Sequence, residues 1–248
     1  MGQLDGKVAV VTGSNRGIGQ AIAVGYANEG AHVALVCRGD PKETVSLIER
    51  GGRKCAVFPC ELSEVSNIVP LVKKIVEKCG TIDILYNNAG AQSRHPSTEF
   101  PLSDWSYVMD VNCNSVFFLC QEAGKVMISK GYGKIINMAS LLSFQGGLTV
   151  PAYAASKGAV MQFTKSLSNE WAKLGVNVNC IAPGYFDTDM NTALINDPTR
   201  SRQILERIPA GRWGKPEDIV GAAIFLASRG SDYVNGIVIP VDGGWLGR

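Results

Sequence analysis

Short, continuous apolar segments alternate with longer helix-like segments along the whole chain. Such runs are typical of strands that are covered on both faces of a parallel sheet. We expect strands at residues 7–12, 32–37, 54–59, 82–88, 133–140, 176–182 and 236–241. We expect helices at residues 18–29, 41–50, 64–78, 103–129, 152–174 and 216–227. Repeated strand–helix–strand units predict an α/β fold, namely a doubly wound (Rossmann) domain with a seven-stranded parallel sheet and helices on both faces.

One segment breaks this regular alternation. No Pro/Gly-rich linker, internal repeat or low-complexity stretch divides residues 1–248, so we expect a single domain. Residues 183–214, however, separate the sixth strand from the next helix and mix polar with helix-forming residues. Doubly wound folds bind ligands at the carboxyl ends of their strands, where such insertions lie. We interpret residues 184–214 as a substrate lid, with a plain surface excursion as the alternative.

The composition narrows the class of partner. The formal net charge of +2, without a run of Lys and Arg, makes nucleic acid an unexpected partner. The polar start at residues 1–7 and the short apolar stretch after it predict neither a signal peptide nor a membrane segment. The seven cysteines have no CxxC spacing and the chain has only two histidines. We therefore expect reduced thiols, no metal site and a cytoplasmic protein.

A glycine-rich turn follows the first predicted strand and opens the first predicted helix. Its glycines let the backbone approach a diphosphate, and the helix N-terminus supplies unpaired N–H groups and positive potential. A strand before the turn and a helix after it are the context that this motif requires. We expect a dinucleotide cofactor here, in contact with Gly13, Asn15, Arg16, Gly17, Ile18 and Gly19.

The end of the second predicted strand bears on the choice of cofactor. An acidic residue there would accept hydrogen bonds from the adenosine ribose and repel a 2′-phosphate. This chain has Arg38 instead, which could hold that phosphate, together with Arg16, through charge-assisted hydrogen bonds. We expect NADP in preference to NAD. The alternative is that Arg38 is a solvated residue near Asp40 or Glu43.

A tyrosine and a lysine lie four residues apart in a predicted helix. Residues at this spacing share a helix face, so Tyr153 and Lys157 should project side by side. A nearby positive charge favours the phenolate, and the expected effect is a lowered pKa for Tyr153. A tyrosine tuned in this way can act as a general acid or base. Two ordinary residues on a surface helix are the alternative.

Two further features point to the same edge of the predicted sheet. The motif Asn87-Asn88-Ala89-Gly90 stands at the end of the fourth strand, where an amide can satisfy loop backbone groups and small residues let a cofactor lie close. Asn112 lies within a long helical stretch, where Asn is unfavourable by propensity. Asn112 could face solvent or hold a water on a proton path.

These motifs resemble those of the short-chain dehydrogenase/reductase family over the whole chain. The resemblance implies that Tyr153 transfers the substrate proton and that Ser140 holds the reacting oxygen. It implies that Lys157 binds the nicotinamide ribose and tunes Tyr153, that Asn112 positions a relay water, and that Thr188 binds the carboxamide. The remaining implied cofactor contacts are Glu61, which stands where the family has Asp near the adenine, Leu62, Asn88, Ala89, Gly90, Pro183 and Gly184. The family also suggests a homotetramer, with residues 152–174 and the C-terminal segment as contact surfaces.

A narrower resemblance concerns the substrate. Residues 143–147, 169–172, 182–185, 207–214, 231–236 and 241–246 look like a subgroup that acts on sugar acids of the 2-deoxy-gluconate or 2-dehydro-3-deoxy-gluconate type. Members of that subgroup commonly favour NAD, which conflicts with the interpretation of Arg38. Dehydrogenation of gluconate at C5 and reduction of a 3-oxoacyl thioester are enzymatic alternatives. A nucleotide-sensing binding protein is the non-enzymatic one.

A hydroxylated acid needs hydrogen-bonding groups and a cation in its site. Arg94, His95 and Gln145 follow strand ends on the cofactor side. We expect Arg94 and Gln145 to contact the substrate, with Tyr185 as a wall of the pocket, and ordinary packing is the alternative for Tyr185. His95, Arg200, Arg202 and Trp213 are further candidates, each of which could equally be a solvated or packing residue.

Overall fold

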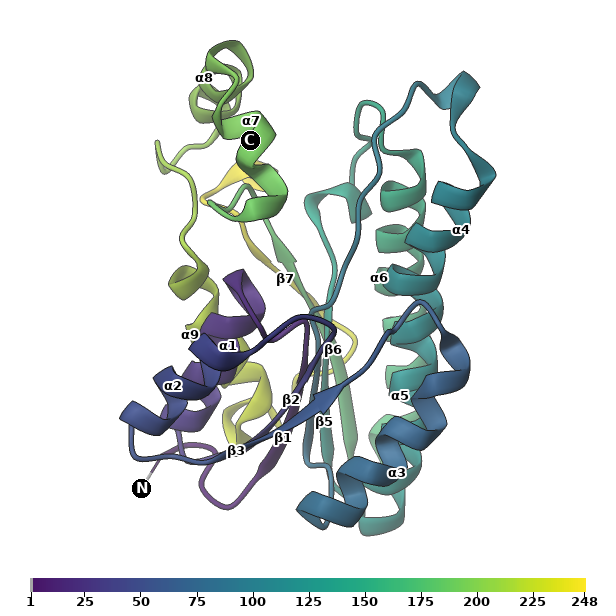
Figure 1. Ribbon diagram of the computed structural model, residues 1–248, viewed down its shortest axis with the longest axis vertical. Helices are drawn as coiled ribbons and strands as arrows, with labels where there is room; N and C mark the ends of the chain where they lie inside the picture. Colours follow the sequence, from purple (N-terminus) through teal and green to yellow (C-terminus); the bar gives the residue numbers. More distant parts are fainter. Residues whose placement is uncertain (1) are drawn as a thin grey trace.

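The computed structural model describes residues 2–248 and contains a seven-stranded sheet in the order β3-β2-β1-β4-β5-β6-β7 (Figure 1). Every neighbouring pair of strands is parallel. The strands are β1 (Val8–Thr12), β2 (His32–Cys37), β3 (Cys55–Pro59), β4 (Ile84–Asn87), β5 (Gly133–Met138), β6 (Val176–Pro183) and β7 (Val238–Val241). The sequence prediction of a doubly wound parallel sheet is confirmed. Met1 lies outside the described residues.

Helices cover both faces of the sheet (Figure 1). One face carries α1 (Gly17–Asn28), α2 (Lys42–Arg50) and α9 (Val220–Ala227). The other carries α3 (Ile68–Cys79), α5 (Ser115–Lys130) and α6 (Pro151–Trp171), with α4 (Leu102–Met109) against α6. Residues 184–214, interpreted above as a lid and called the lid segment below, contain two short helices at the carboxyl edge of the sheet, α7 (Thr192–Ile195) and α8 (Pro198–Arg207).

Two apolar cores lie on opposite sides of the sheet, and successive strand residues alternate between them. In β1, Val10 packs into the core beneath α3, α5 and α6, whereas Ala9 and Val11 pack into the core beneath α1, α2 and α9. All five residues of β1 are buried. Burial on both faces is the physical reason for the continuous apolar runs in the sequence.

The predicted helix at 103–129 differs from the observed structure in two ways. It begins at Leu102, directly after Pro101 and one residue before the predicted start, and the Asp104 carboxylate in its first turn pairs with His95 at 2.8 Å. It is also interrupted by a turn of π-helix, η3 (Asp110–Asn114), between α4 and α5. Such wider turns often mark functional sites within helices.

The segment interpreted as a lid lies above the carboxyl ends of the strands (Figure 1). The Asp197 carboxylate caps α8 by accepting hydrogen bonds from the N–H groups of Thr199 and Arg200 at 2.9 and 3.0 Å. An exposed ion pair of 2.7 Å joins Asp189, at the start of this segment, to Arg16 in the glycine-rich turn. The segment therefore contacts the turn that precedes α1.

The structure bears on two expectations from the composition, which concern the thiols and membrane-spanning helices. All seven cysteines are free thiols. Among residues 2–248, no helix has the length and apolar character that crossing a membrane requires.

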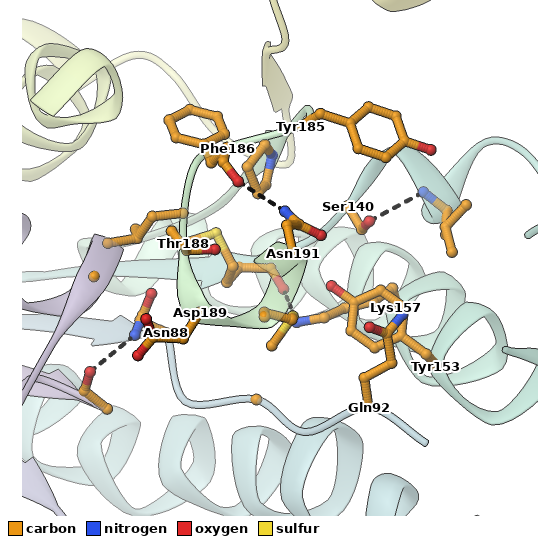
Figure 2. A pocket seen from close by; sticks show the side chains of 18 of the residues that line it. Asn88, Gln92, Ser140, Tyr153, Lys157, Tyr185, Phe186, Thr188, Asp189 and Asn191 are labelled. Atoms are coloured by element: carbon orange, nitrogen blue, oxygen red, sulfur yellow. Dashed lines mark hydrogen bonds between the residues drawn. The ribbon is translucent and has the colours of Figure 1, made fainter. Parts of the chain in front are cut away.

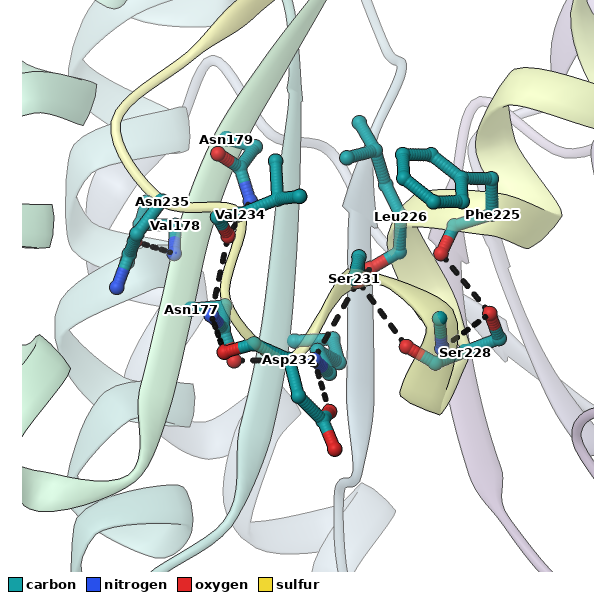
Figure 3. A network of polar contacts seen from close by, with 12 residues as sticks. Asn177, Val178, Asn179, Phe225, Leu226, Ser228, Ser231, Asp232, Val234 and Asn235 are labelled. Carbon is teal, nitrogen blue, oxygen red and sulfur yellow. Dashed lines mark hydrogen bonds and ion pairs between the residues drawn. The ribbon is translucent and has the colours of Figure 1, made fainter.

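A buried ammonium stabilises the opposite edge of the sheet, around the loop that leads into β7 (Figure 3). The Lys134 side chain is only 1% exposed, and its Nζ donates to Asp232 Oδ1 at 2.7 Å, Asn177 Oδ1 at 3.0 Å and Ser231 Oγ at 3.3 Å. Asn177 Nδ2 in turn donates to the carbonyls of Asp232 and Val234. This network joins the amino ends of β5 and β6 to the loop before β7.

The Lys134–Asp232 pair predicts an asymmetric response to substitution. Asp232→Ala leaves a buried ammonium without its carboxylate and should lower the free energy of unfolding by about 2 kcal/mol or more. Lys134→Met leaves a carboxylate that is already 61% exposed, and it should cost about 1 kcal/mol or less. Urea unfolding of both variants tests this order, with the exposed pair member Asp40→Ala as the control. A larger loss for Lys134→Met would contradict it.

Candidate active site

A cleft of about 1120 Å³ opens at the carboxyl edge of the sheet. Strands β1 and β4 are neighbours there, and the chain order runs outward from them in both directions. This reversal leaves a crevice in which doubly wound folds bind ligands. The cleft is lined by the glycine-rich turn, the residues after β2, β3, β4, β5 and β6, and the lid segment.

Two glycines of the turn allow a close approach to the end of β4. Gly13 has a φ of +64°, and a Cβ at this position would lie 2.9 Å from Asn88 Nδ2 and 3.0 Å from the Cα of Ala89. A Cβ on Gly19 would overlap the carbonyl oxygen of Gly13. Asn88 Nδ2 donates to the carbonyls of Thr12 and Gly13 at 3.0 and 3.3 Å. The Asn88 amide therefore fixes the shape of the turn.

The third glycine and the first turn of α1 fit a diphosphate. Gly17 has a φ of +55°, and a Cβ there would have Thr188 Cγ2 as its nearest neighbour at 3.7 Å. The preceding Arg16 makes no side-chain cap on α1, so the first N–H groups of the helix are not satisfied by a cap. Open space, unpaired N–H groups and the positive helix end are the requirements for binding a phosphate anion.

The guanidinium expected to bind a 2′-phosphate already has partners. Arg38 Nη1 lies 3.1 Å from Glu61 Oε2 and 3.4 Å from the Tyr107 hydroxyl. Partial burial opposes ionisation of Glu61, but hydrogen bonds from Ser63 and the pairing with Arg38 hold the pKa of this carboxyl below its usual value. Arg38, Glu61 and Leu62 all line the cleft. A 2′-phosphate would compete with Glu61 for Arg38.

Ser140, Tyr153 and Lys157 come together at the centre of the cleft (Figure 2). Lys157 is 2% exposed, and its Nζ donates to the carbonyl of Met138, the last residue of β5, at 2.7 Å. Nζ lies 5.6 Å from the centroid of the Tyr153 ring. Ser140 begins a short 3₁₀ turn, where its Oγ accepts a hydrogen bond from Leu142 N at 3.1 Å. The shared helix face predicted for Tyr153 and Lys157 is therefore present.

The pKa values of these groups differ from the sequence expectation. Burial raises the pKa of Tyr153 above its usual value, while the Ser140 hydroxyl and the charge of Arg94 act to lower it. The sequence expectation of a lowered Tyr153 pKa was wrong for the protein alone, because desolvation outweighs the lowering by Ser140 and Arg94. Burial also lowers the pKa of Lys157, to about 8. Lys157 is thus less strongly held as a cation than an exposed lysine.

Asn112 lies in the π-helical turn and does not line the cleft formed by residues 2–248. Its Oδ1 accepts from Ala91 N at 2.7 Å, and its Nδ2 donates to Ala91 O at 2.9 Å and Ser156 Oγ at 3.1 Å. Both amide hydrogens are therefore used within the protein. The side chain joins the segment after β4 to α6, next to Tyr153 and Lys157.

The other predicted cofactor contacts are mostly at the cleft. Gly19 and Asn112 are not among the residues that line the cleft. The predicted residues that do line it are Gly13, Asn15, Arg16, Gly17, Ile18, Arg38, Glu61, Leu62, Asn88, Ala89, Gly90, Tyr153, Lys157, Pro183, Gly184 and Thr188.

The predicted substrate contacts Arg94, Gln145 and Tyr185 line the cleft, as does Arg200. His95, Arg202 and Trp213 do not. His95 is paired with Asp104 at 2.8 Å, and Arg202 Nε lies 3.8 Å from Glu206. Trp213 instead stacks edge-on against the ring of Tyr185, with the ring centroids 5.6 Å apart.

Sequence reasoning missed several polar residues of the lining, among them Gln92, Asn191, Gln203 and Arg207. Arg207 was visible only as part of the motif at residues 207–214. Its position at the C-terminal end of a lid helix, in the segment expected to cover substrate, was the signal that could have identified it. Figure 2 shows Gln92 and Asn191 among the side chains that line the same pocket as Tyr153 and Lys157.

Comparisons with known proteins agree with this geometry. A family model described as Enoyl-(Acyl carrier protein) reductase matches residues 13–246. The chain is 50% identical over 246 residues to 2-dehydro-3-deoxy-D-gluconate 5-dehydrogenase of Dickeya dadantii (strain 3937), covering 99% of this chain and 97% of that protein.

Two solved structures share the fold over almost their whole length. One is a provisionally assigned 2-deoxy-D-gluconate 3-dehydrogenase of Agrobacterium tumefaciens with bound NADP, with a TM-score of 0.94, 48% identity and coverage of 99% of this chain and 98% of that one. The other is a gluconate 5-dehydrogenase of Burkholderia cenocepacia J2315 in complex with NADP and tartrate, with a TM-score of 0.94, 40% identity and coverage of 99% and 97%.

The buried Lys157 predicts a pH-dependent stability. Its pKa falls from the ordinary 10.5 to about 8 in the folded protein, so between these values the unfolded chain binds more protons. The free energy of unfolding of the wild type, relative to Lys157→Met, should therefore rise between about pH 8 and 10.5, by up to about 3 kcal/mol. Denaturant unfolding of both proteins at several pH values measures this difference. Parallel profiles, or a falling difference, would contradict the buried ammonium.

Proposed function

The chain belongs to the short-chain dehydrogenase/reductase family, and we propose that it is an NAD(P)-dependent oxidoreductase of sugar acids. Its substrate is a secondary alcohol, or the corresponding ketone, of the 2-deoxy-gluconate or 2-dehydro-3-deoxy-gluconate type. The 50% identity to a 2-dehydro-3-deoxy-D-gluconate 5-dehydrogenase over 99% of the chain supports this class. The observation that carries the proposal is the cleft shared by Ser140, Tyr153, Lys157 and the glycine-rich turn.

The proposed cofactor is NADP, with NAD as the alternative. The glycine turn and the first turn of α1 hold the diphosphate, and Arg38 faces the adenosine ribose from the end of β2. Two structural relatives contain bound NADP. Glu61 pairs with Arg38 at 3.1 Å, which limits the gain in affinity from a 2′-phosphate and leaves room for NAD.

Proton transfer is assigned to Tyr153. When bound, the nicotinamide supplies the hydride acceptor or donor. In the oxidative direction Tyr153, as the phenolate, takes the proton of the substrate hydroxyl, and in reduction it returns that proton. Ser140 donates a hydrogen bond to the same oxygen as charge changes on it, an effect worth about 2–4 kcal/mol in comparable sites.

Lys157 and Asn112 position these groups. One N–H of the Lys157 ammonium is donated to Met138 O, which leaves two for the cofactor ribose and for the electrostatic tuning of Tyr153. Asn112 fixes the segment after β4 against α6 through Ala91 and Ser156. A relay water, if held by this residue, must use groups other than the Nδ2 hydrogens.

We further propose that the protein works as a cytoplasmic homotetramer, with α6 and the C-terminal segment as contact surfaces. Tyr233, in the loop before β7, has its side chain fully in solvent in the single chain, and Ile237 is 45% exposed. Two exposed large apolar residues four positions apart in the chain support an interface there.

Tyr153→Phe tests the assignment of the proton carrier. The variant should retain NADP affinity within about threefold but lose at least about 100-fold in kcat, because a general acid–base catalyst contributes 10²–10⁴. Absorbance of the reduced nicotinamide, with 2-dehydro-3-deoxy-D-gluconate, gluconate, neutral polyols and an oxoacyl thioester, measures turnover. Near-normal turnover in this variant would remove Tyr153 from the mechanism, and preference for the thioester would contradict the substrate class.

Glu61→Gln tests the arrangement around Arg38. Freed from its carboxylate partner, Arg38 should bind a 2′-phosphate better, so the ratio of the NAD to the NADP Kd should rise about three- to tenfold. Isothermal titration of the protein with each dinucleotide measures this ratio without turnover. Glu64→Gln, an exposed neighbour, is the control. An unchanged ratio would show that Glu61 does not restrain Arg38.

A further inference from the structure

Three segments far apart in the sequence meet on one wall of the cleft. They contribute Gln145 from the loop after β5, Arg207 from the end of α8 and Trp245 from the segment after β7. Arg207 Nη2 and Trp245 Nε1 both donate to Gln145 Oε1, each at 3.3 Å. The Arg207 guanidinium lies 4.1 Å from the centroid of the Trp245 ring. The mechanism derived above uses neither Arg207 nor Trp245.

This cluster fixes the Arg207 guanidinium before any ligand binds. Trp245 is itself rigidly held, since it is 4% exposed and packs against Tyr185 with the ring centroids 4.8 Å apart. Stacking on the indole and one hydrogen bond to Gln145 define the plane of the guanidinium. A group ordered in advance loses less side-chain entropy when it binds a ligand.

The charge of Arg207 is also uncompensated. Of the arginines that line the cleft, Arg16 pairs with Asp189 and Arg38 pairs with Glu61. Within residues 2–248, no carboxylate forms an ion pair with Arg207, whose side-chain partners are a neutral amide and a neutral ring. Four N–H groups of the guanidinium therefore stay available, in a planar fork that matches a carboxylate.

The other unpaired arginines of the lining are less suited to this role. Arg94 Nη2 donates to Gln92 Oε1 at 3.1 Å. Its charge partly offsets the rise that burial causes in the Tyr153 pKa, which places Arg94 near the reacting phenol. Arg200 has no side-chain partner that would fix its guanidinium among the described residues. Arg207 is the last residue of α8, beside the C-terminus, where Arg248 Nη1 donates to Glu206 O at 2.9 Å.

We propose that Arg207, oriented by Gln145 and Trp245, is the carboxylate subsite of this enzyme. It binds the carboxylate of the sugar acid and so determines which carbon of the chain reaches Tyr153. Because Gln145 Oε1 already accepts two hydrogen bonds, its Nε2 is the group left to donate to the substrate. This inference rests on the proposed function, and it adds a site and a ligand chemistry to it.

Arg207→Gln is the direct test, in the complete protein saturated with NADP. For 2-dehydro-3-deoxy-D-gluconate, KM should rise on the order of 10- to 100-fold with kcat nearly retained, as expected for loss of a charge-assisted pair. For the carboxamide of the same sugar acid, KM should be unchanged, because the neutral group makes no ion pair. Inhibition by tartrate, a dicarboxylate without the reacting carbon, should weaken by a similar factor.

Two further variants keep the test conclusive. Arg202 lies on the same helix outside the cleft and pairs with Glu206. Arg202→Gln should therefore leave KM, kcat and the inhibition by tartrate unchanged. Arg207→Lys preserves the charge and should recover part of the preference for the acid over the amide. Thermal unfolding of each variant separates loss of binding from loss of folding.

An equal rise in KM for acid and amide, or a selective loss in Arg94→Gln but not in Arg207→Gln, would overturn the proposal while leaving the sugar-acid function intact. Failure of the wild type to turn over any sugar acid would instead contradict the proposed function, and the carboxylate subsite with it.

Discussion

The hydrogen bond from the buried Lys157 ammonium to the carbonyl of Met138 is the contact on which the candidate active site depends. Met138 ends β5, and Ser140 follows two residues later. Tyr153 lies one helical turn before Lys157 on α6. This 2.7 Å contact, with a second 2.7 Å hydrogen bond from Ser143 Oγ to Lys157 O, sets the position of the phenol against that of the hydroxyl. Desolvation of the ammonium opposes this arrangement, and it is the cause of the lowered pKa of Lys157.

Side-chain amides hold the loops around that contact. Asn88 donates to Thr12 and Gly13, so it joins the end of β4 to the glycine-rich turn. Asn112 both donates to and accepts from the backbone of Ala91, as a neighbouring strand would. Asn191 donates to the carbonyl of Phe186 at 2.8 Å within the lid segment. These bonds satisfy backbone groups where the sheet ends, and they give the cleft fixed walls.

The sequence allowed prediction of those features that depend on local pattern. Continuous apolar runs predicted the parallel strands, and four-residue spacing predicted the common face of Tyr153 and Lys157. Features that depend on tertiary contact could not be predicted. The π-helical turn at Asp110–Asn114 has no distinctive sequence pattern. The pKa of Tyr153 depends on how deeply the folded protein buries the phenol and on which charges lie near it. The Arg207–Gln145–Trp245 cluster joins positions 62 and 100 residues apart.

The arginines at the two ends of the cleft have different kinds of partner. At the cofactor end Arg38 forms an ion pair with Glu61, whereas at the substrate end Arg207 is held by neutral groups only.

The most direct test of the account is a crystal structure with NADP and an unreactive sugar-acid analogue bound together. We expect the reacting oxygen within hydrogen-bonding distance of both the Tyr153 and Ser140 hydroxyls. A reacting oxygen bound away from Tyr153, or a nicotinamide ring outside the cleft, would contradict the account.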